Sequence, residues 1–327
     1  MQNNHHQHTG FNTDQEIRWC PGCGDYAVLS QVKKVLAQMA VPKENQVFLS
    51  GIGCAARMPN YINTYGFRGL LGQAINVGLG LKVCRPELTV WVVMGDGEGF
   101  GSATSALLHA ARRNVDIKVL FVNNETQGLS RGQPSSTTRE GTLTPINPDG
   151  TEDPSWSACH MMIASGATFV AKSIDVDVNH LEQVLTRAST HRGFAFVEIL
   201  QNCKVYNDMV FDHMVDHSSR TEQVLYLEHG KPLLYGPRLR KGLYFEQANL
   251  KTLNVSSSDP FPSIHDELDI DSNRAAILAS RSNPENPECL GVFRAVENNC
   301  HHQNHWMGNP ATQNPADLAG DDCFIVE

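Results

Sequence analysis

Four of the nine cysteines stand where their thiols could hold a metal centre. Cys20 and Cys23 form a CxxC pair, Cys54 ends the segment Gly51–Cys54, and Cys203 follows an apolar run. Tetrathiolate coordination suits either a structural Zn²⁺ or a [4Fe–4S] cluster. Zinc ribbons use two paired knuckles, whereas this set is one pair and two single residues, so the spacing favours the cluster. Nine cysteines in so long a chain do not predict a disulfide scaffold, and we expect a reducing compartment.

A second group of residues could bind a divalent cation together with a diphosphate. Asp96 lies in Gly95-Asp96-Gly97 and Asn124 in the pair Asn123-Asn124, each directly after an apolar run. Carboxylate and amide oxygens suit Mg²⁺, which keeps phosphate oxygens among its ligands, and the glycines let a diphosphate approach the backbone. The alternative is a tight strand-to-helix turn with an N-capping aspartate. Because Asn124 is followed by Gly128-Leu129, the cation–diphosphate interpretation is the better one.

Two arginines follow these motifs closely. Arg57 comes three residues after Cys54, and Arg131 comes two residues after Leu129. An anionic substrate or coenzyme would need such a partner, since a guanidinium binds carboxylate and phosphate groups in bidentate fashion. The alternative for each is a solvated surface charge. We interpret both as candidate anion contacts.

The elements that position these residues alternate along the chain. Apolar runs predict strands at 47–49, 89–94, 117–122, 168–171 and 194–200. Helical spacing predicts helices at 26–39, 72–83, 102–113, 155–164 and 178–190, and 126–153 shows no periodicity. Such alternation predicts a doubly wound, mostly parallel sheet with helices on both faces. Ligands of these sheets bind beyond the carboxyl ends of the strands, where the motifs above converge.

Composition narrows the class of protein. The chain has 327 residues, 41% of them hydrophobic, and a formal net charge of -9. We expect no nucleic-acid partner, because that function requires a basic face, and no membrane span, because no apolar run approaches ~20 residues. The polar start predicts no signal peptide, which favours a cytoplasmic protein. We divide the chain into a polar segment (1–17), a cofactor-binding domain (18–205) and an irregular C-terminal extension (206–327).

The motifs taken together resemble the β subunit of the 2-oxoacid:ferredoxin oxidoreductases. The resemblance runs from about residue 18 to 208, and the branch that uses 2-oxoglutarate is matched by three further segments, 201–208, 227–232 and 291–297. It departs from the family pattern where Arg57 and Arg131 stand in place of lysine, and arginine keeps the charge with a planar fork. The motifs that carry it are Trp19–Gly24, Gly51–Cys54, Tyr65–Phe67, Gly95–Gly97, His109–Asn114, Asn123-Asn124 and Gly128-Leu129.

This resemblance implies a thiamine-diphosphate-binding fold and a specific set of ligands. Mg²⁺ would be held by the side chains of Asp96 and Asn124 and by the backbone carbonyl of Thr126. One [4Fe–4S] cluster would be held by Cys20, Cys23, Cys54 and Cys203. The residues implied to line the thiamine diphosphate site are Ile52, Gly53, Cys54, Ala55, Gly95, Asp96, Gly97, Glu98, Asn124, Thr126, Gly128 and Leu129.

The implied activity is the coenzyme A-dependent oxidative decarboxylation of 2-oxoglutarate to succinyl-CoA and CO₂. Electrons would pass through the cluster to ferredoxin, and an α subunit would supply the carboxylate that activates thiamine, giving an (αβ)₂ assembly. Pyruvate or another 2-oxoacid is the alternative substrate. A non-oxidative thiamine enzyme would leave the four thiols without a role. A zinc-binding module that has lost catalysis is the alternative from a different class, and the metal content of the anaerobically purified protein would distinguish it.

Overall fold

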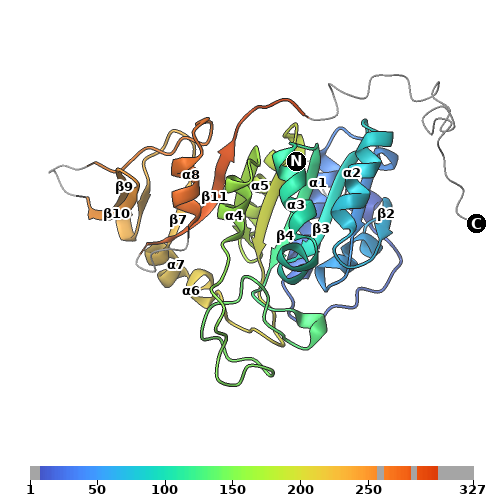
Figure 1. Cartoon of the computed structure of the whole chain (residues 1–327), viewed down its shortest axis with the longest axis horizontal. Coiled ribbons are helices and arrows are strands. Elements are labelled where there is room, and N and C mark those ends of the chain that lie inside the picture. Colours follow the sequence, from blue (N-terminus) through green and yellow to red (C-terminus); the bar gives the residue numbers. More distant parts are fainter. Residues whose placement is uncertain (1–7, 256–260, 281–285, 301–327) are drawn as a thin grey trace, which may run out of the picture.

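Eight strands form the central sheet of the computed structural model, which describes residues 8–255, 261–280 and 286–300 (Figure 1). The strand order is β2-β1-β3-β4-β6-β5-β11-β7, and every neighbouring pair is parallel except β5 with β11. The strands of this sheet are β1 (Gln46–Ser50), β2 (Tyr65–Arg68), β3 (Thr89–Gly95), β4 (Ile117–Asn123), β5 (Phe169–Ile174), β6 (Ala195–Leu200), β7 (Val224–Leu227) and β11 (Glu288–Ala295).

The helices cover both faces of this sheet. They are α1 (Asp25–Gln38), α2 (Ala74–Cys84), α3 (Thr104–Arg112), α4 (Ala158–Ala164), α5 (Val178–Thr190), α6 (Asp212–Val215), α7 (His217–Gln223) and α8 (Asn273–Ala279). Along β3, Val92 and Met94 join the hydrophobic core beneath α2, α3, α4 and α8, whereas Trp91 and Val93 join the core beneath α1 and α5. Side chains alternate in this way because successive residues of a strand point to opposite faces. The predicted fold, a mostly parallel sheet between two helical layers, is confirmed.

The predicted elements of the first two hundred residues are present, with shifted ends. The helix predicted at 178–190 has those bounds, and the strand predicted at 117–122 is one residue longer. The helix predicted from 102 begins at Thr104, because a π-helical turn, η4 (Glu98–Ser102), separates it from β3. Such turns are frequent at functional sites, and this one directly follows the Gly-Asp-Gly motif.

The C-terminal part of the chain contributes to the same sheet. β7 and β11 extend it beyond β5, and a separate antiparallel sheet is built from β8 (Leu234–Tyr235), β9 (Lys241–Glu246) and β10 (Asn249–Asn254). In Figure 1 this small sheet lies at the end of the molecule opposite to β2. Residues 1–7 and 301–327 of the two predicted end segments lie outside the described residues, and the division at 17 and 205 stays a prediction.

Among the described residues, no helix is both long enough and apolar enough to cross a membrane.

The carboxyl ends of β1, β3, β4 and β6 all reach the same edge of the sheet, because these strands run in parallel. That edge carries the loops in which the predicted site residues stand.

Candidate functional site

A cavity of about 430 Å³ opens beyond the carboxyl ends of β1, β3 and β4. All twelve residues predicted to line a thiamine diphosphate site line this cavity: Ile52, Gly53, Cys54, Ala55, Gly95, Asp96, Gly97, Glu98, Asn124, Thr126, Gly128 and Leu129. They come from three loops that are far apart in the sequence. The parallel sheet brings these loops together, as expected for a ligand site at a topological switch point.

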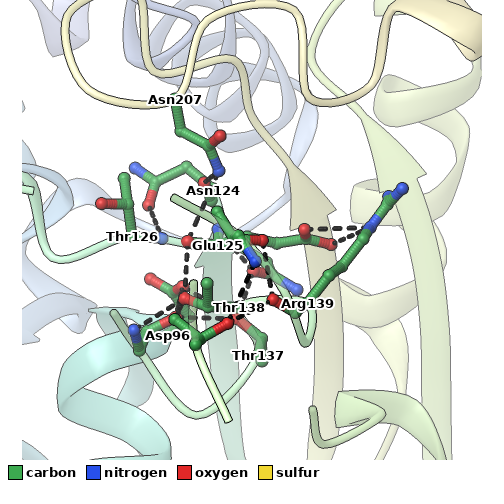
Figure 2. Close-up of polar contacts among 12 residues, drawn as sticks. Asp96, Asn124, Glu125, Thr126, Thr137, Thr138, Arg139 and Asn207 are labelled. Atoms are coloured by element: carbon green, nitrogen blue, oxygen red, sulfur yellow. Dashed lines mark hydrogen bonds and ion pairs between the residues drawn. The ribbon is translucent and has the colours of Figure 1, made fainter. Parts of the chain in front are cut away.

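Asp96 is one of three buried acidic residues that line the cavity, with Asp25 and Glu98. Its Oδ2 accepts hydrogen bonds from the hydroxyls of Ser135, at 2.6 Å, and Thr137, at 2.9 Å (Figure 2). Burial raises the pKa of Asp96 to about 6, although the two hydroxyls and the backbone at Gly97 act in the opposite direction. A buried carboxylate is costly unless it is compensated, and a divalent cation would supply the missing charge.

The turn that follows β4 carries the other two predicted metal ligands. Asn124 Nδ2 donates to Gln201 Oε1 at 2.9 Å, so its Oδ1 is the oxygen that faces the Thr126 backbone, 3.3 Å from the Thr126 nitrogen. Asn207 Nδ2 donates to the carbonyl of Asn124 at 2.9 Å and anchors the turn from outside (Figure 2). The amide of Asn124 therefore has a fixed orientation and presents its oxygen within the cavity wall.

Gly97 lines the cavity and Gly51 lies directly before a lining residue in the chain, and neither has room for a side chain. A Cβ on Gly97 would come within 2.4 Å of Gln127 Cγ, and a Cβ on Gly51 would come within 1.7 Å of Glu98 Oε1. Gly97 directly follows Asp96, so its main chain borders the space beside the carboxylate in which an anion would lie. Oxygen donors from Asp96 and Asn124 beside such a glycine fit a Mg²⁺–diphosphate group.

A second cavity, of about 290 Å³, contains all four predicted thiols. Cys20, Cys23, Cys54 and Cys203 line it together with Arg57. Among the described residues, no three Cys, His, Asp or Glu side chains converge on a single-ion site. Four thiols around one hollow fit a metal centre held by thiolates, and both a zinc ion and a [4Fe–4S] cluster take such ligands.

The two cavities share a wall. Cys54, Asn124, Gly128 and Leu129 line both of them. A Cβ on Gly128 would lie 3.4 Å from Cys54 Sγ and 3.9 Å from Cys203 Sγ, so the backbone of Gly128 stands directly against two thiols. A redox group held by the thiols would therefore be separated from the first cavity only by this thin wall.

The thiols lie in an environment that opposes the thiolate form. Burial raises the pKa of Cys54 to about 11, and it raises the pKa of Cys23 further still. Buried Asp25, which lines the first cavity, adds to the rise for both thiols, and its own pKa is raised to about 7, mainly by burial. Thiolates in such a place need a bound metal centre to balance their charge.

The two predicted anion contacts have different positions. Arg57 lines the thiol cavity, and its guanidinium donates to the backbone carbonyl of Arg18. Arg131 is exposed and has a left-handed backbone, with φ of 62°, at the end of the short turn η5 (Gly128–Ser130). Arg131 lines neither cavity, so the structure brings together only Arg57 with the other predicted residues.

Sequence reasoning missed several residues of the site. Asp25 lines the first cavity, and its position next to the CxxC pair was the only signal for it. Thr137 and Ser135, which hold Asp96, come from the long aperiodic segment and gave no signal at all. Asn207 was noticed only as part of a longer matched segment, although it fixes the turn at Asn124.

Comparison with known proteins identifies relatives of this chain. Residues 47–199 match the family model "Thiamine pyrophosphate enzyme, C-terminal TPP binding domain". The 2-oxoglutarate oxidoreductase subunit KorB of Mycobacterium tuberculosis is 38% identical over 293 residues, which is 88% of this chain and 77% of that protein. The β subunit of 2-oxoacid:ferredoxin oxidoreductase 1 of Aeropyrum pernix is 36% identical over 199 residues, 61% of this chain and 63% of that one.

A solved structure also resembles this fold. It is the 2-oxoglutarate:ferredoxin oxidoreductase of Magnetococcus marinus with 2-oxoglutarate, coenzyme A and succinyl-CoA bound. The TM-score is 0.73 at 25% sequence identity, and the similarity covers 92% of this chain and 89% of that one.

Proposed function

The chain belongs to the β subunits of the 2-oxoacid:ferredoxin oxidoreductases, and we propose that with an α subunit it oxidises 2-oxoglutarate and coenzyme A to succinyl-CoA and CO₂. The observation that carries this proposal is the wall shared by the two cavities, formed in part by Cys54 and Gly128. It lies between the cavity that we propose for the cofactor and the cavity lined by four thiols. A thiamine enzyme that removes electrons needs this proximity, whereas a non-oxidative one does not.

The first cavity is proposed to hold Mg²⁺ and thiamine diphosphate. Asp96 and Asn124 would contribute side-chain oxygens to the ion, and Thr126 would contribute its carbonyl. The main chain of Gly97, which lines the cavity, would border the diphosphate. Thiamine diphosphate supplies an electron sink for decarboxylation when it is bound, and the task of the chain is to orient it and to exclude water.

The four thiols are proposed to hold one [4Fe–4S] cluster. The thiol cavity adjoins the first cavity, and a redox cluster would use this proximity, whereas a structural zinc ion would not. A bound metal centre would offset the burial that raises the pKa of Cys54 and Cys23, and it would let both bind as thiolates. Cys203 and Cys54 adjoin Gly128, so the electron path to the first cavity is short. Thiols that must stay reduced suit the reducing cytoplasm, which is the proposed compartment. Ferredoxin is the proposed electron acceptor.

Arg57 is proposed to hold an anionic group of the substrate or of coenzyme A at the thiol cavity, because a guanidinium can bind a carboxylate in bidentate fashion. Arg131 is proposed to serve the same purpose from outside the two cavities, on a surface that is exposed in the isolated chain.

An α subunit is the partner of a chain of this family, and an (αβ)₂ assembly is proposed. Ile52, Leu71 and Leu129 line the first cavity and are 42–49% exposed, so apolar surface surrounds its mouth. A partner that covers this surface would exclude water from the cavity. We propose that the same partner supplies the carboxylate that thiamine activation requires.

Co-expression with the α subunit under anaerobic conditions tests this function. The expected complex is brown, contains about four iron and four sulfide per β chain, and reduces ferredoxin with 2-oxoglutarate and coenzyme A. Pyruvate and branched-chain 2-oxoacids should give lower kcat/KM. Colourless protein with stoichiometric zinc would contradict the proposal, as would a lone β chain that turns over at a typical enzymatic rate of about 10 s⁻¹.

A further inference from the structure

A buried pair of opposite charges lies in the middle of the sheet, apart from both cavities. Lys172 on β5 and Glu198 on β6 are directly paired in register, and each is 1% exposed. Lys172 Nζ lies 3.4 Å from Glu198 Oε2 and 2.6 Å from Oε1 of Glu288 on β11, so its ammonium is shared by two carboxylates. A well-packed apolar pair of the same size is often as stable as a buried ion pair, or more stable. Stability alone therefore gives no reason for these two charges.

A reason for these charges is found at the other carboxylate oxygen of Glu198, Oε1. Asn123, the last residue of β4, donates from Nδ2 to Glu198 Oε1 at 2.7 Å. Asn123 is completely buried, and its amide can bind in either of two orientations. An ionised carboxylate accepts hydrogen bonds and donates none, so it selects the orientation with Nδ2 toward Glu198. Oδ1 of Asn123 must then point the other way.

This orientation of Asn123 supports the turn beyond β4. Asn123 Oδ1 accepts from the Glu125 backbone nitrogen at 3.1 Å and from the Thr137 hydroxyl at 2.9 Å. Glu125 has a left-handed backbone, with φ of 53°, which is strained for a residue with a side chain. A strained turn persists only where its surroundings hold it, and here the surroundings include the Asn123 amide.

The same turn carries the proposed metal ligands. Asn124 and Thr126 flank the strained Glu125, and Thr137 also donates to Asp96 Oδ2 (Figure 2). Bonds of 2.7–3.1 Å thus connect Glu198 through Asn123 to both sides of the cation site. Groups that orient metal ligands in this way contribute to metal affinity without touching the ion.

We propose that Glu198, neutralised by Lys172, is a positioning residue for the Mg²⁺–diphosphate site and acts through the Asn123 amide. This inference rests on the proposed function, because it assumes that the first cavity binds Mg²⁺ and thiamine diphosphate. Lys172 lies beside the Glu198 carboxylate, and this carboxylate keeps Asn123 in the one orientation that supports the turn. Cys159, whose thiol donates to Glu198 Oε2 at 3.1 Å, also helps to orient the carboxylate.

The decisive variant replaces both charges together. In the α-complexed chain, Glu198→Leu with Lys172→Met removes the ion pair. Glu288, whose Oε1 lies 2.6 Å from Lys172 Nζ, also loses that contact, but its side chain is 20% exposed and can be solvated. The complex should unfold at the same temperature as the unmodified one, or higher. Half-saturation with thiamine diphosphate, measured by calorimetry, should require about tenfold more Mg²⁺, the low end for loss of an outer partner of a metal site. Full stoichiometry should return at high Mg²⁺, and the iron content should not change.

The matched control is a residue at the other end of β4, the strand that ends at Asn123. Lys118, near the start of β4, is also a buried lysine and is paired with Asp116 at 2.6 Å. Lys118→Met removes a buried charge from β4 without touching Asn123, and its Mg²⁺ requirement should equal that of the unmodified complex. Should the double variant not accumulate, Glu198→Gln takes its place. Its amide presents a donor either to Asn123 or to Lys172, so the Mg²⁺ requirement should rise in the same direction.

The outcomes separate this inference from the proposed function. An unchanged Mg²⁺ requirement in the double variant overturns the role of Glu198 and leaves the proposed function standing. Reduced stoichiometry at saturating Mg²⁺, together with a lower unfolding temperature, shows a purely structural role and overturns the inference as well. An unmodified complex that binds no thiamine diphosphate at any Mg²⁺ concentration overturns the proposed function, and the inference falls with it.

Discussion

The indole nitrogen of Trp19 donates a hydrogen bond of 2.8 Å to the backbone carbonyl of Cys54. The rings of Tyr26 and Tyr61 pack edge-on against the same indole, with centroids 5.5 and 4.9 Å away. The segment with the CxxC pair is thereby joined to the loop of a third thiol, 35 positions further along the chain. The mutual placement of three thiols depends on one buried tryptophan.

Trp19→Phe should make the metal centre less stable while the chain stays folded. Phenylalanine keeps most of the packing but loses the donor to Cys54, a contribution of about 1 kcal/mol for a typical hydrogen bond. We expect faster bleaching of the iron–sulfur absorbance in air, measured on anaerobically purified complex. Trp91→Phe is the matched control, because the Trp91 indole nitrogen is buried with no hydrogen-bond partner among the described residues. Equal bleaching rates for the two variants would contradict the proposed role of Trp19.

Serine substitution should distinguish the four cavity thiols from the remaining cysteines. Cys20→Ser and Cys203→Ser should lose or destabilise the cluster, because each removes one of the thiols that line a single cavity. Cys84→Ser should retain it, since Cys84 is exposed at the end of α2. Cys159→Ser should also retain it, since that thiol is buried against Glu198 and serine keeps the donor. Iron and sulfide analysis checks all four, and similar iron content throughout would refute this choice of ligands.

Asp96→Asn should abolish thiamine diphosphate binding and leave the cluster spectrum intact. The substitution removes the charge that a cation requires, while Ser135 and Thr137 can still donate to the amide oxygen. Residues that only support metal ligands contribute about 10- to 100-fold to affinity, so loss of a direct ligand should weaken binding by more than about 100-fold. Calorimetry at fixed Mg²⁺ measures this loss. Normal thiamine diphosphate affinity at limiting Mg²⁺ would show that Asp96 is not a ligand.

His191 should make folding sensitive to mild acid. Burial, followed by the nearby ammonium of Lys118, lowers the pKa of His191 to about 4, and Nε2 lies 2.8 Å from the Thr168 hydroxyl. The unfolded chain takes up this proton near pH 6.5 and the folded chain does not, so the unfolding free energy should fall as the pH drops from 6.5 toward 4. Urea denaturation at pH 7.5, 6.5 and 5.0 measures this.

His191→Gln supplies the comparison for that experiment. Glutamine keeps a polar group near Thr168 but does not titrate, so its unfolding free energy should fall less between pH 6.5 and 5.0. If the unfolding free energies of His191→Gln and of the unmodified chain fall equally with pH, other groups control the acid sensitivity.

The sheet and its functional edge could be predicted from the sequence because both follow from local pattern. Apolar runs that end in Gly95-Asp96-Gly97 and Asn123-Asn124 predict parallel strands, and parallel strands place their ends together. The edge strand Tyr65–Arg68 gave no such signal, since all four of its residues are exposed. β11 could not be placed either, because its antiparallel pairing with β5 depends on contacts across more than a hundred residues.

The wall shared by the two cavities could not be predicted from the sequence pattern either. It depends on the approach of Gly128 to Cys54 and Cys203, three positions brought together only by the tertiary fold. The network behind Asp96 depends on hydroxyl groups of the aperiodic segment, where sequence spacing carries no information about direction. Candidate ligands could therefore be proposed from the sequence, whereas the groups that hold those side chains in place could not.

The exposed edge strand β2 has a consequence for handling the protein. Tyr65 and Phe67 are 65% and 58% exposed on a strand that ends the sheet, so one row of its backbone groups has no neighbouring strand in the described chain. Such an edge is a template on which another copy can add a strand. The isolated chain should therefore form larger species as its concentration rises. Recovery of monodisperse material, and not only turnover, then becomes a measure of whether something covers this edge.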